Sequence, residues 1–247
     1  MNASPPSRWL EADNRLDLWV DFLNHVKVRT MAEIGVFRGE FARHILAHCP
    51  TISRYYMLDP WRHLDGWNKP LNVSDSEFDA AYEKALRNTD EHAKKRVVLR
   101  GKTAESLDQI ADGELDFAYL DGDHTLRGIT VDLIGVHAKV RQGGWIAGDD
   151  FHPSVWHHGS RFEPTLVFPF AVYFAEAIDA PVSALPHRQF LIEKRQGFVF
   201  TDFVGRYANL ELRPQIARPP TSKEPGVRSL WRGALRRLSK RFDRRPG

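Results

Sequence analysis

Short apolar runs alternate with amphipathic segments over most of the chain. The apolar runs predict buried strands at Met31–Val36, Arg54–Leu58, Arg96–Leu99, Leu115–Leu120 and Trp145–Ala147. The segments between and around them have helical spacing at Arg15–Val26, Glu40–His48, Asp75–His92, Thr125–Val140 and Phe168–Ile178. Two later runs, Pro181–Leu185 and Phe190–Lys194, predict an antiparallel terminal hairpin. This alternation predicts an α/β fold with a doubly wound, mostly parallel sheet and helices on both faces.

The stretch Leu115–Phe151 carries the densest group of ionisable residues. Its first strand ends at Asp121-Gly122-Asp123-His124, and its second ends at Gly148-Asp149-Asp150 after a Gly143-Gly144 turn. Because a strand, a helix and a parallel strand return the chain to the same sheet edge, both acidic clusters should meet there. Four carboxylates and an imidazole at one edge need a cation, a proton or a substrate to compensate them. The pattern therefore indicates a metal site or an acid/base site.

Composition narrows the class of protein. The 247 residues are 42% hydrophobic and 27% charged, which suits one elaborated globular domain. Cys49 is the only cysteine, so an internal disulfide and a cysteine-based zinc cage are excluded. No apolar run is long enough for a membrane-spanning helix, and the first residues lack the pattern of a secretory signal. A cytoplasmic location is the expectation.

Charge divides the chain unevenly. The whole sequence carries +3, whereas residues 226–247 hold eight basic residues against Asp243 alone, so the remainder carries −4. We expect a lead-in and helix over 1–29, the main domain over 30–212, a Pro-rich linker over 213–226 and a basic amphipathic helix over 227–247. That helix suits either peripheral contact with an anionic membrane or self-association. No recognition motif accompanies the charge, so nucleic-acid binding is not expected.

The end of the first predicted strand suits a nucleoside ligand. It reads Glu33-x-Gly35-x-x-x-Gly39, and glycines let a backbone approach a ligand closely. Asp59, at the end of the next strand, is placed to accept hydrogen bonds from a ribose diol. The spacing differs from G-x-G-x-x-G, so a dinucleotide is not favoured. The structural alternative is that Gly35 and Gly39 only permit a tight turn.

Taken together, the motifs resemble a known enzyme family. Glu33-Ile-Gly-Val-Phe-Arg-Gly39, Asp59, Gly101-Lys-Thr-Ala-Glu105, Asp121-Gly-Asp-His124 and Gly143-Gly-Trp-Ile-Ala-Gly-Asp149-Asp150 occur in the order expected for class I S-adenosylmethionine-dependent methyltransferases. More narrowly, they resemble the metal-dependent small-molecule O-methyltransferases related to macrocin O-methyltransferase. Catechol O-methyltransferase is a more distant relative. The resemblance implies a seven-stranded Rossmann-like sheet.

The resemblance also implies roles for individual residues. The cofactor-binding set would be Glu33, Gly35 and Gly39 beside the methionine part, Asp59 at the ribose, and Thr103 and Ala104 near the adenine, with Phe37 and Asp121 completing it. Asp121, Asp149 and Asp150 match the family's divalent-metal ligands, and oxygen-only ligands favour Mg²⁺. Such a metal would bind the acceptor hydroxyl and lower its pKa. His124 or Asp123 falls at the general base, and we favour His124 slightly because imidazole titrates near neutral pH.

Other interpretations of the same residues stay open. Asp121 is also placed to cap the helix near Thr125, and Asp149-Asp150 is also a plausible turn. The histidines at 152, 157 and 158 permit a non-haem iron oxygenase with two histidines and a carboxylate. A non-catalytic cofactor-binding or membrane-associated protein is the third alternative. The expected partner is a small-molecule acceptor with a hydroxyl, free or on a glycoside. The loops at 61–73 and 152–162 do not identify it.

Overall fold

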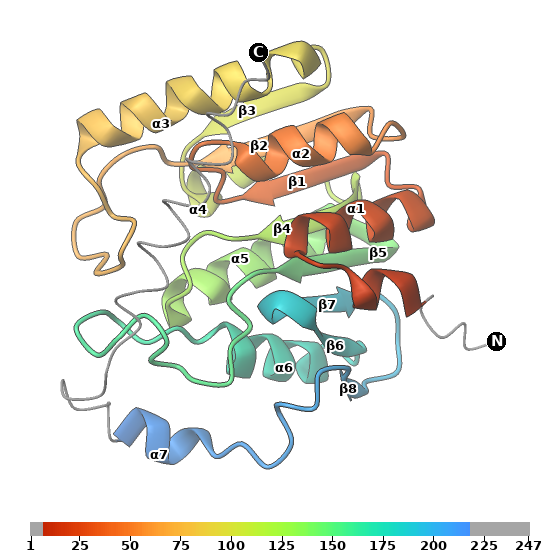
Figure 1. The fold of residues 1–247 in the computed structure, drawn as a ribbon, viewed down its shortest axis with the longest axis vertical. Helices are drawn as coiled ribbons and strands as arrows, with labels where there is room; N and C mark the ends of the chain where they lie inside the picture. Colours follow the sequence, from red (N-terminus) through yellow and green to blue (C-terminus); the bar gives the residue numbers. More distant parts are fainter. Residues whose placement is uncertain (1–6, 218–247) are drawn as a thin grey trace, which may run out of the picture.

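The fold is a three-layered α/β domain, seen in a computed structural model that describes residues 7–217 (Figure 1). One sheet contains all the described strands in the order β3-β2-β1-β4-β5-β7-β6-β8. Their bounds are β1 Thr30–Ile34, β2 Arg54–Asp59, β3 Arg96–Arg100, β4 Leu115–Leu120, β5 Val140–Gly148, β6 Val182–Leu185, β7 Gln189–Glu193 and β8 Phe200–Asp202. The predicted fold class is confirmed.

The strand pairings follow the predicted parallel core and antiparallel end. Strands β1 to β5 pair in parallel, while β7 pairs antiparallel with both β5 and β6. The described sheet has one strand more than the seven expected, because β8 adds a three-residue strand parallel to β6. So short a segment has no periodicity that a sequence could reveal.

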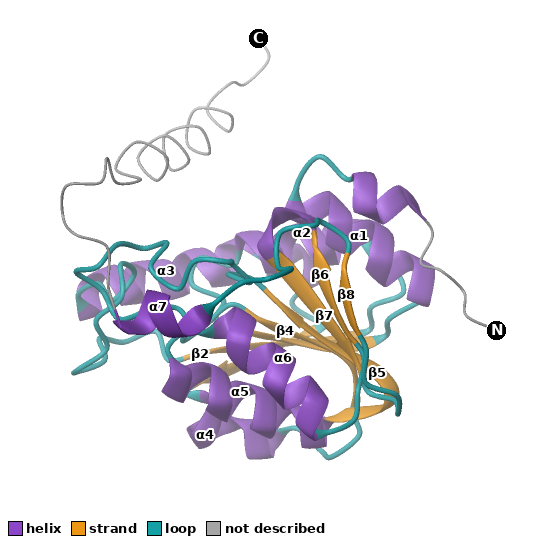
Figure 2. Cartoon of the chain, turned by 90° about the horizontal axis from the view of Figure 1, so that it is seen from below, coloured by secondary structure: helices purple, strands orange, loops and turns teal. Residues whose placement is uncertain are grey.

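Helices cover both faces of the sheet. In Figure 2, α1 (Arg15–Val26) and α2 (Glu40–His48) lie on one side, and α4 (Thr103–Ser106), α5 (Leu126–Lys139) and α6 (Val167–Ala177) lie on the other. The core is correspondingly split into two buried clusters. The cluster on the α1 side also takes in α3 (Asp75–Asn88).

Local chemistry explains where several helices begin. The side chain of Asn14 accepts hydrogen bonds from the backbone N–H groups of Leu16 and Asp17 at the start of α1. Ser74 and Glu77 form a capping box at α3. Thr125 caps α5 by accepting from the Gly128 N–H, so Asp121 does not serve as that cap.

Strand β5 is longer than predicted. It starts at Val140, and the Gly143-Gly144 pair lies inside it rather than in a turn before it. The register against β4 shifts between Leu115 and Phe117, so the glycines are accommodated as an irregularity within the ladder.

Both ends of the described region hold structure that the sequence did not indicate. Ser7–Glu11 forms a 3-10 helix in the expected lead-in, and Trp9 is buried against Phe22. Leu212–Ala217 forms α7, so the expected linker begins with helical residues. The rest of that linker and the predicted basic helix at 227–247 lie outside the described residues. Among the described helices, none combines the length and apolarity that a membrane crossing requires.

Candidate active site at the ends of the parallel strands

The two acidic clusters meet at one sheet edge, as predicted. The backbone N–H of Asp121 donates to Ile34 O at 2.8 Å, and that of Asp149 donates to Leu120 O at 3.0 Å, which ties the three loops after β1, β4 and β5 together. Gly35 lies at their junction with φ 92°, and a Cβ there would stand 2.3 Å from the carbonyl oxygen of Asp121. Glycine is therefore required for the contact between the loops as well as for the backbone conformation.

Asp59 is used to fix the loop after β1. One carboxylate oxygen, Oδ2, accepts from the backbone N–H groups of Val36 and Phe37 at 2.9 and 2.8 Å. The other, Oδ1, accepts from Trp61 N–H at 2.7 Å. Burial raises the pKa of Asp59, and these three N–H groups oppose that rise. Asp59, the residue predicted to hold the ribose, thus lies at the end of β2, and backbone N–H groups of the neighbouring loop orient its carboxylate.

The other predicted cofactor residues surround the same turn. Glu33 is buried and accepts from Tyr55 Oη at 2.7 Å, and burial raises its pKa well above the usual value. Gly39, with φ 70°, precedes α2, and no side chain among the described residues caps that helix. The N–H groups at an uncapped helix start suit a carboxylate such as that of the cofactor's methionine part. Phe37, which lies between Gly35 and Gly39, also has positive φ, at 48°.

The predicted adenine neighbours differ in exposure. Thr103 is buried and donates its hydroxyl to Asp132 Oδ1 at 2.5 Å, whereas Ala104 is exposed at the surface. Burial raises the pKa of Asp132 to about 7, and the Thr103 hydrogen bond opposes that rise.

Arg15 neutralises two of the three carboxylates predicted to bind metal. Its guanidinium Nη1 contacts Asp121 Oδ2 at 2.9 Å and also Asp149 Oδ2. Burial raises the pKa of Asp121 to about 7, with Arg15 opposing and Asp149 adding to the effect. Gln189 also donates to Asp149, at 2.6 Å, and holds that carboxylate in place. The carboxylates of Asp121 and Asp149 need a cation to balance their charge, and Arg15 of the same chain supplies it.

The third predicted metal ligand, Asp150, faces different partners. Its backbone has φ 57°, a left-handed conformation that Asp tolerates, so the consecutive carboxylates of Asp149 and Asp150 diverge. Asp150 Oδ2 lies 2.7 Å from His124 Nδ1. Its oxygens also lie 3.2 Å from His157 Nε2 and 3.3 Å from His158 Nε2. The three-carboxylate set is therefore not gathered around one point.

His124 is held as a histidine–carboxylate pair. With Nδ1 engaged by Asp150, its Nε2 faces Asp121 Oδ1 at 3.7 Å and, although buried, has no hydrogen-bond partner among the described residues. Burial lowers the pKa of His124, but the neighbouring carboxylates, first of all Asp150, raise it to about 9 overall. Conversely, His124 and His157 hold the pKa of Asp150 well below its usual value against the effect of burial.

Asp123, the other predicted base, has a structural task. Its Oδ1 accepts from Trp67 Nε1 at 2.8 Å and from the Thr125 N–H at 3.0 Å. It thereby joins the long loop after β2 to the start of α5. Trp61 in the same loop is fully buried and packs edge-on against Tyr82, so it belongs to the core.

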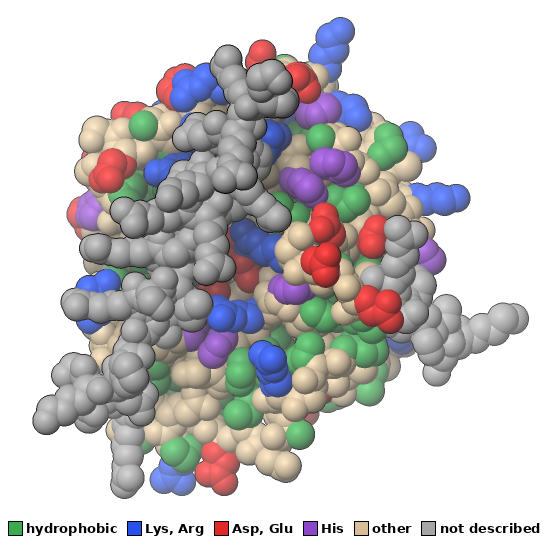
Figure 3. Space-filling view, viewed as in Figure 1, with side chains coloured by type: hydrophobic (Ala, Val, Ile, Leu, Met, Phe, Trp, Pro, Cys, Tyr) green, Lys and Arg blue, Asp and Glu red, His purple; other side chains and the backbone are tan. Residues whose placement is uncertain are grey.

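Two loops far apart in sequence close over this edge. Lys69 is buried, and its ammonium donates to the carbonyl oxygen of Glu163 at 2.9 Å and to Thr165 Oγ1 at 3.0 Å. Asn68 donates to the Arg161 carbonyl at 2.8 Å. The loop at 61–73 therefore lies directly against the end of the loop at 152–162 and the residues that follow it. On the face shown in Figure 3, acidic, basic and histidine side chains gather close together.

Sequence reasoning missed Arg15, Lys69 and Gln189. Arg15 begins an amphipathic helix, Lys69 belongs to an irregular loop, and Gln189 starts a terminal strand. Nothing in their local spacing distinguishes them from solvent-exposed polar residues. Only the tertiary fold brings them to the acidic edge.

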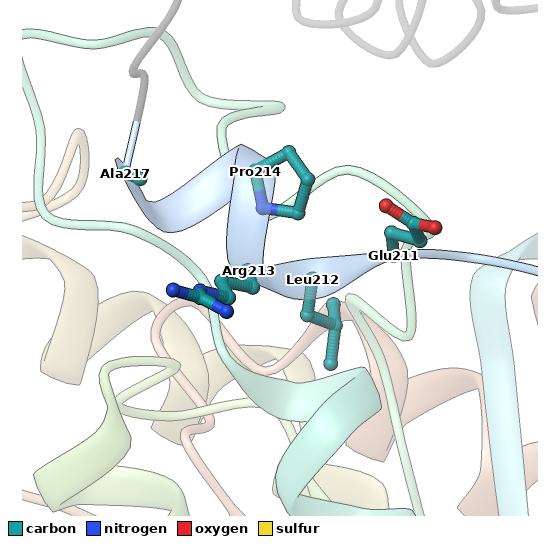
Figure 4. A pocket seen from close by; sticks show the side chains of 5 residues that line it. All are labelled: Glu211, Leu212, Arg213, Pro214 and Ala217. Carbon is teal, nitrogen blue, oxygen red and sulfur yellow. The ribbon is translucent and has the colours of Figure 1, made fainter.

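A separate hollow of about 680 Å³ lies on α7, lined by Glu211, Leu212, Arg213, Pro214 and Ala217 (Figure 4). None of the residues predicted for the active site contributes to it. We therefore assign the chemistry to the strand ends.

Comparison with known proteins identifies the type of domain. Residues 32–151 match the family model of a methyltransferase domain. Over these residues the protein carries a methyltransferase domain. The matched region contains every residue predicted for the cofactor, the metal and the base, and it ends just before His152. No curated protein matches this chain in sequence.

Solved structures share the methyltransferase fold at low identity. A Podospora anserina methyltransferase with S-adenosylhomocysteine bound is 15% identical, with a TM-score of 0.53, and the match covers 78% of this chain and 83% of that one. An O-methyltransferase from Bacillus cereus in complex with S-adenosylhomocysteine is 15% identical, with a TM-score of 0.50 and coverage of 77% and 82%. A Staphylococcus aureus protein assigned as a caffeoyl-CoA O-methyltransferase is 12% identical, with a TM-score of 0.54 and coverage of 72% and 80%.

Proposed function

We propose that this methyltransferase transfers a methyl group from S-adenosylmethionine to a hydroxyl oxygen of a small molecule or glycoside, with His124 as the general base. The observation that supports this most is the buried Nε2 of His124, which has no hydrogen-bond partner in the described part of the chain, while Asp150 holds the other ring nitrogen. A hydroxyl acceptor must lose a proton to become an effective nucleophile, and a positioned imidazole nitrogen can accept it.

The chain's own residues supply positioning and charge. Asp150 accepts the Nδ1 proton of His124, so that in the neutral ring Nε2 carries the lone pair. Because the carboxylates raise the pKa of His124 to about 9, the neutral, base-competent form grows as the pH rises toward that value. Asp121 lies beside that nitrogen, where it stabilises the imidazolium formed when the acceptor's proton arrives. The contacts of Trp67 with Asp123 and of Lys69 with Thr165 hold the loop at 61–73 against this edge. When bound, S-adenosylmethionine supplies the sulfonium methyl group.

The predicted magnesium site fits these residues only in part. Asp121 and Asp149 share one cationic partner, but that partner is Arg15, and Asp150 is engaged by histidines. A magnesium ion bound by all three carboxylates would have to displace Arg15 and turn Asp150 away from His124. We therefore derive no step through magnesium.

A screen of hydroxylated acceptors, read out as formation of S-adenosylhomocysteine, tests the proposal. With any acceptor found, His124→Gln should lower kcat by about 10²- to 10⁴-fold while leaving the affinity for S-adenosylmethionine unchanged. Asp123→Asn is the matched control, because Asn keeps the oxygen that accepts from Trp67 and Thr125, and it should lower kcat less than about tenfold. Unchanged turnover in His124→Gln, or transfer to amines alone, would contradict the proposal.

A further inference from the structure

We propose that Asp150, His157 and His158 form a binding site for a first-row transition-metal dication such as Zn²⁺, separate from the Asp121–Asp149 pair. The two histidines belong to the loop after β5, beyond the end of the region that matches the methyltransferase family. The inference concerns these three residues and does not depend on which methyl acceptor the enzyme uses.

The geometry suits one small cation. One ligand atom from each of the three side chains can be chosen so that all lie within 4.8 Å of one another. His157 Nε2 stands 3.2 Å from Asp150 Oδ1, and His158 Nε2 stands 3.3 Å from Asp150 Oδ2. Metal–ligand bonds of ~2.0–2.1 Å in a tetrahedral zinc site place neighbouring ligand atoms about 3.3 Å apart. Both nitrogen–oxygen separations, one to each oxygen of Asp150, match this spacing.

His157 provides an independent observation. Its side chain is only 4% exposed, and its Nε2 makes no hydrogen bond within the described part of the chain although it faces Asp150. A buried nitrogen lone pair that faces a carboxylate oxygen is repelled unless a cation or a proton lies between them. A metal ion would satisfy both atoms at once.

The far side of each ring is anchored, as expected for metal-binding histidines. His157 Nδ1 lies 3.3 Å from the Ser154 carbonyl oxygen, which suits an Nδ1–H donor and leaves Nε2 as the ligand. His158 Nδ1 lies 3.4 Å from Thr165 Oγ1, and Lys69 donates to that same hydroxyl. These contacts orient both Nε2 atoms toward Asp150 before any metal arrives.

The donor types select the class of metal. Two imidazole nitrogens and one carboxylate favour Zn²⁺, Fe²⁺, Co²⁺ or Ni²⁺ over Mg²⁺, which prefers oxygen ligands. Three protein ligands leave a tetrahedral position for water or an acceptor oxygen. Arg15 already balances Asp121 and Asp149, so those carboxylates do not compete for the ion.

Calorimetric titration of the metal-stripped full chain with Zn²⁺ tests the site. We expect one ion to bind, binding to persist in a large excess of Mg²⁺, and Zn²⁺ to raise the thermal unfolding midpoint. His157→Ala and His158→Ala should each weaken binding at least about tenfold and abolish the thermal shift. Asp149→Asn should leave the affinity within about threefold, since its carboxylate is not a ligand in this site. His48→Asn, which alters another close histidine pair on α2, is the distant control.

Each alternative outcome is distinct. If Zn²⁺ binding survives both histidine variants, or is lost in Asp149→Asn while they retain it, the ion is held by the acidic pair and the proposal is wrong. If the wild-type chain binds no Zn²⁺, or Mg²⁺ displaces it, protons rather than a metal satisfy the cluster and the proposal is also wrong. The Mg²⁺ competition uses the wild-type chain, so it decides the matter even if a variant fails to fold.

Discussion

The two sides of the sheet edge stabilise their buried carboxylates in different ways. After β1 and β2, the buried acids are satisfied locally, because Asp59 accepts three backbone N–H groups and Glu33 accepts the Tyr55 hydroxyl. After β4 and β5, the carboxylates depend on cationic or titratable side chains from elsewhere, notably Arg15 and His157. The first side is a rigid frame suited to binding a cofactor. On the second side, binding of a proton or a metal ion changes how the carboxylate charges are balanced, which suits catalysis.

The strongest test of the rigid side is Gly35→Ala. The added Cβ would overlap the Asp121 carbonyl at 2.3 Å and force a strained φ, so we expect a loss of at least about 3 kcal/mol in the free energy of unfolding, together with loss of cofactor binding. Gly66→Ala is the matched control, because Gly66 also has positive φ, at 73°, but no atom of residues 7–217 lies within 4 Å of its Cβ position. It should cost only about 1 kcal/mol. Urea unfolding of both variants measures the difference, and equal losses would contradict the contact between the loops.

Removing Arg15 tests the charged side. In Arg15→Gln, Asp121 and Asp149 lose their shared cation, and we expect stability to fall by about 1–2 kcal/mol. The effect is smaller than for a fully buried pair because the Arg15 side chain is 36% exposed. Arg15→Lys keeps the charge and should lose less. Thermal unfolding measures both, and an Arg15→Gln protein as stable as the wild type would show that the acidic pair needs no compensation.

The last expected effect depends on pH and concerns Asp132, which accepts a hydrogen bond from Thr103, a predicted neighbour of the adenine. Its pKa is raised from 3.8 to about 7, so the folded state holds this proton more tightly than the unfolded state does. Its contribution to stability is therefore complete below about pH 4 and is lost as the pH rises toward 7. Asp132→Asn imitates the protonated form, so its stability relative to the wild type should increase over this range by at least about 1 kcal/mol. A pH-independent difference in urea midpoints would contradict the raised pKa.

The same contrast explains what could be predicted from the sequence. The limits of α1 and α2, the parallel core and the meeting of Asp121 with Asp149 follow from periodicity and from the rule that parallel strands end at one edge. Asp59 also lies at the strand end where the sequence places it, because its contacts are with backbone N–H groups close to that strand end.

What could not be predicted depends on side chains from distant elements. The capture of Asp121 and Asp149 by Arg15 spans more than a hundred residues, and the divergence of Asp150 arises from a single left-handed residue. Neither leaves a pattern in the sequence. The strand β8 and the helix α7 are too short for their periodicity to be distinguished from that of loops.

The most direct measurement is calorimetric titration of wild-type protein and His124→Gln with S-adenosylmethionine. If the cofactor frame and the charged chemistry side are separate, both proteins should bind the cofactor with similar affinity, even though His124→Gln transfers its methyl group about 10²- to 10⁴-fold more slowly. Failure of the folded wild-type protein to bind S-adenosylmethionine would contradict the assignment of the β1–β2 side. Loss of cofactor binding in a folded His124→Gln protein would contradict the division of the site into two parts.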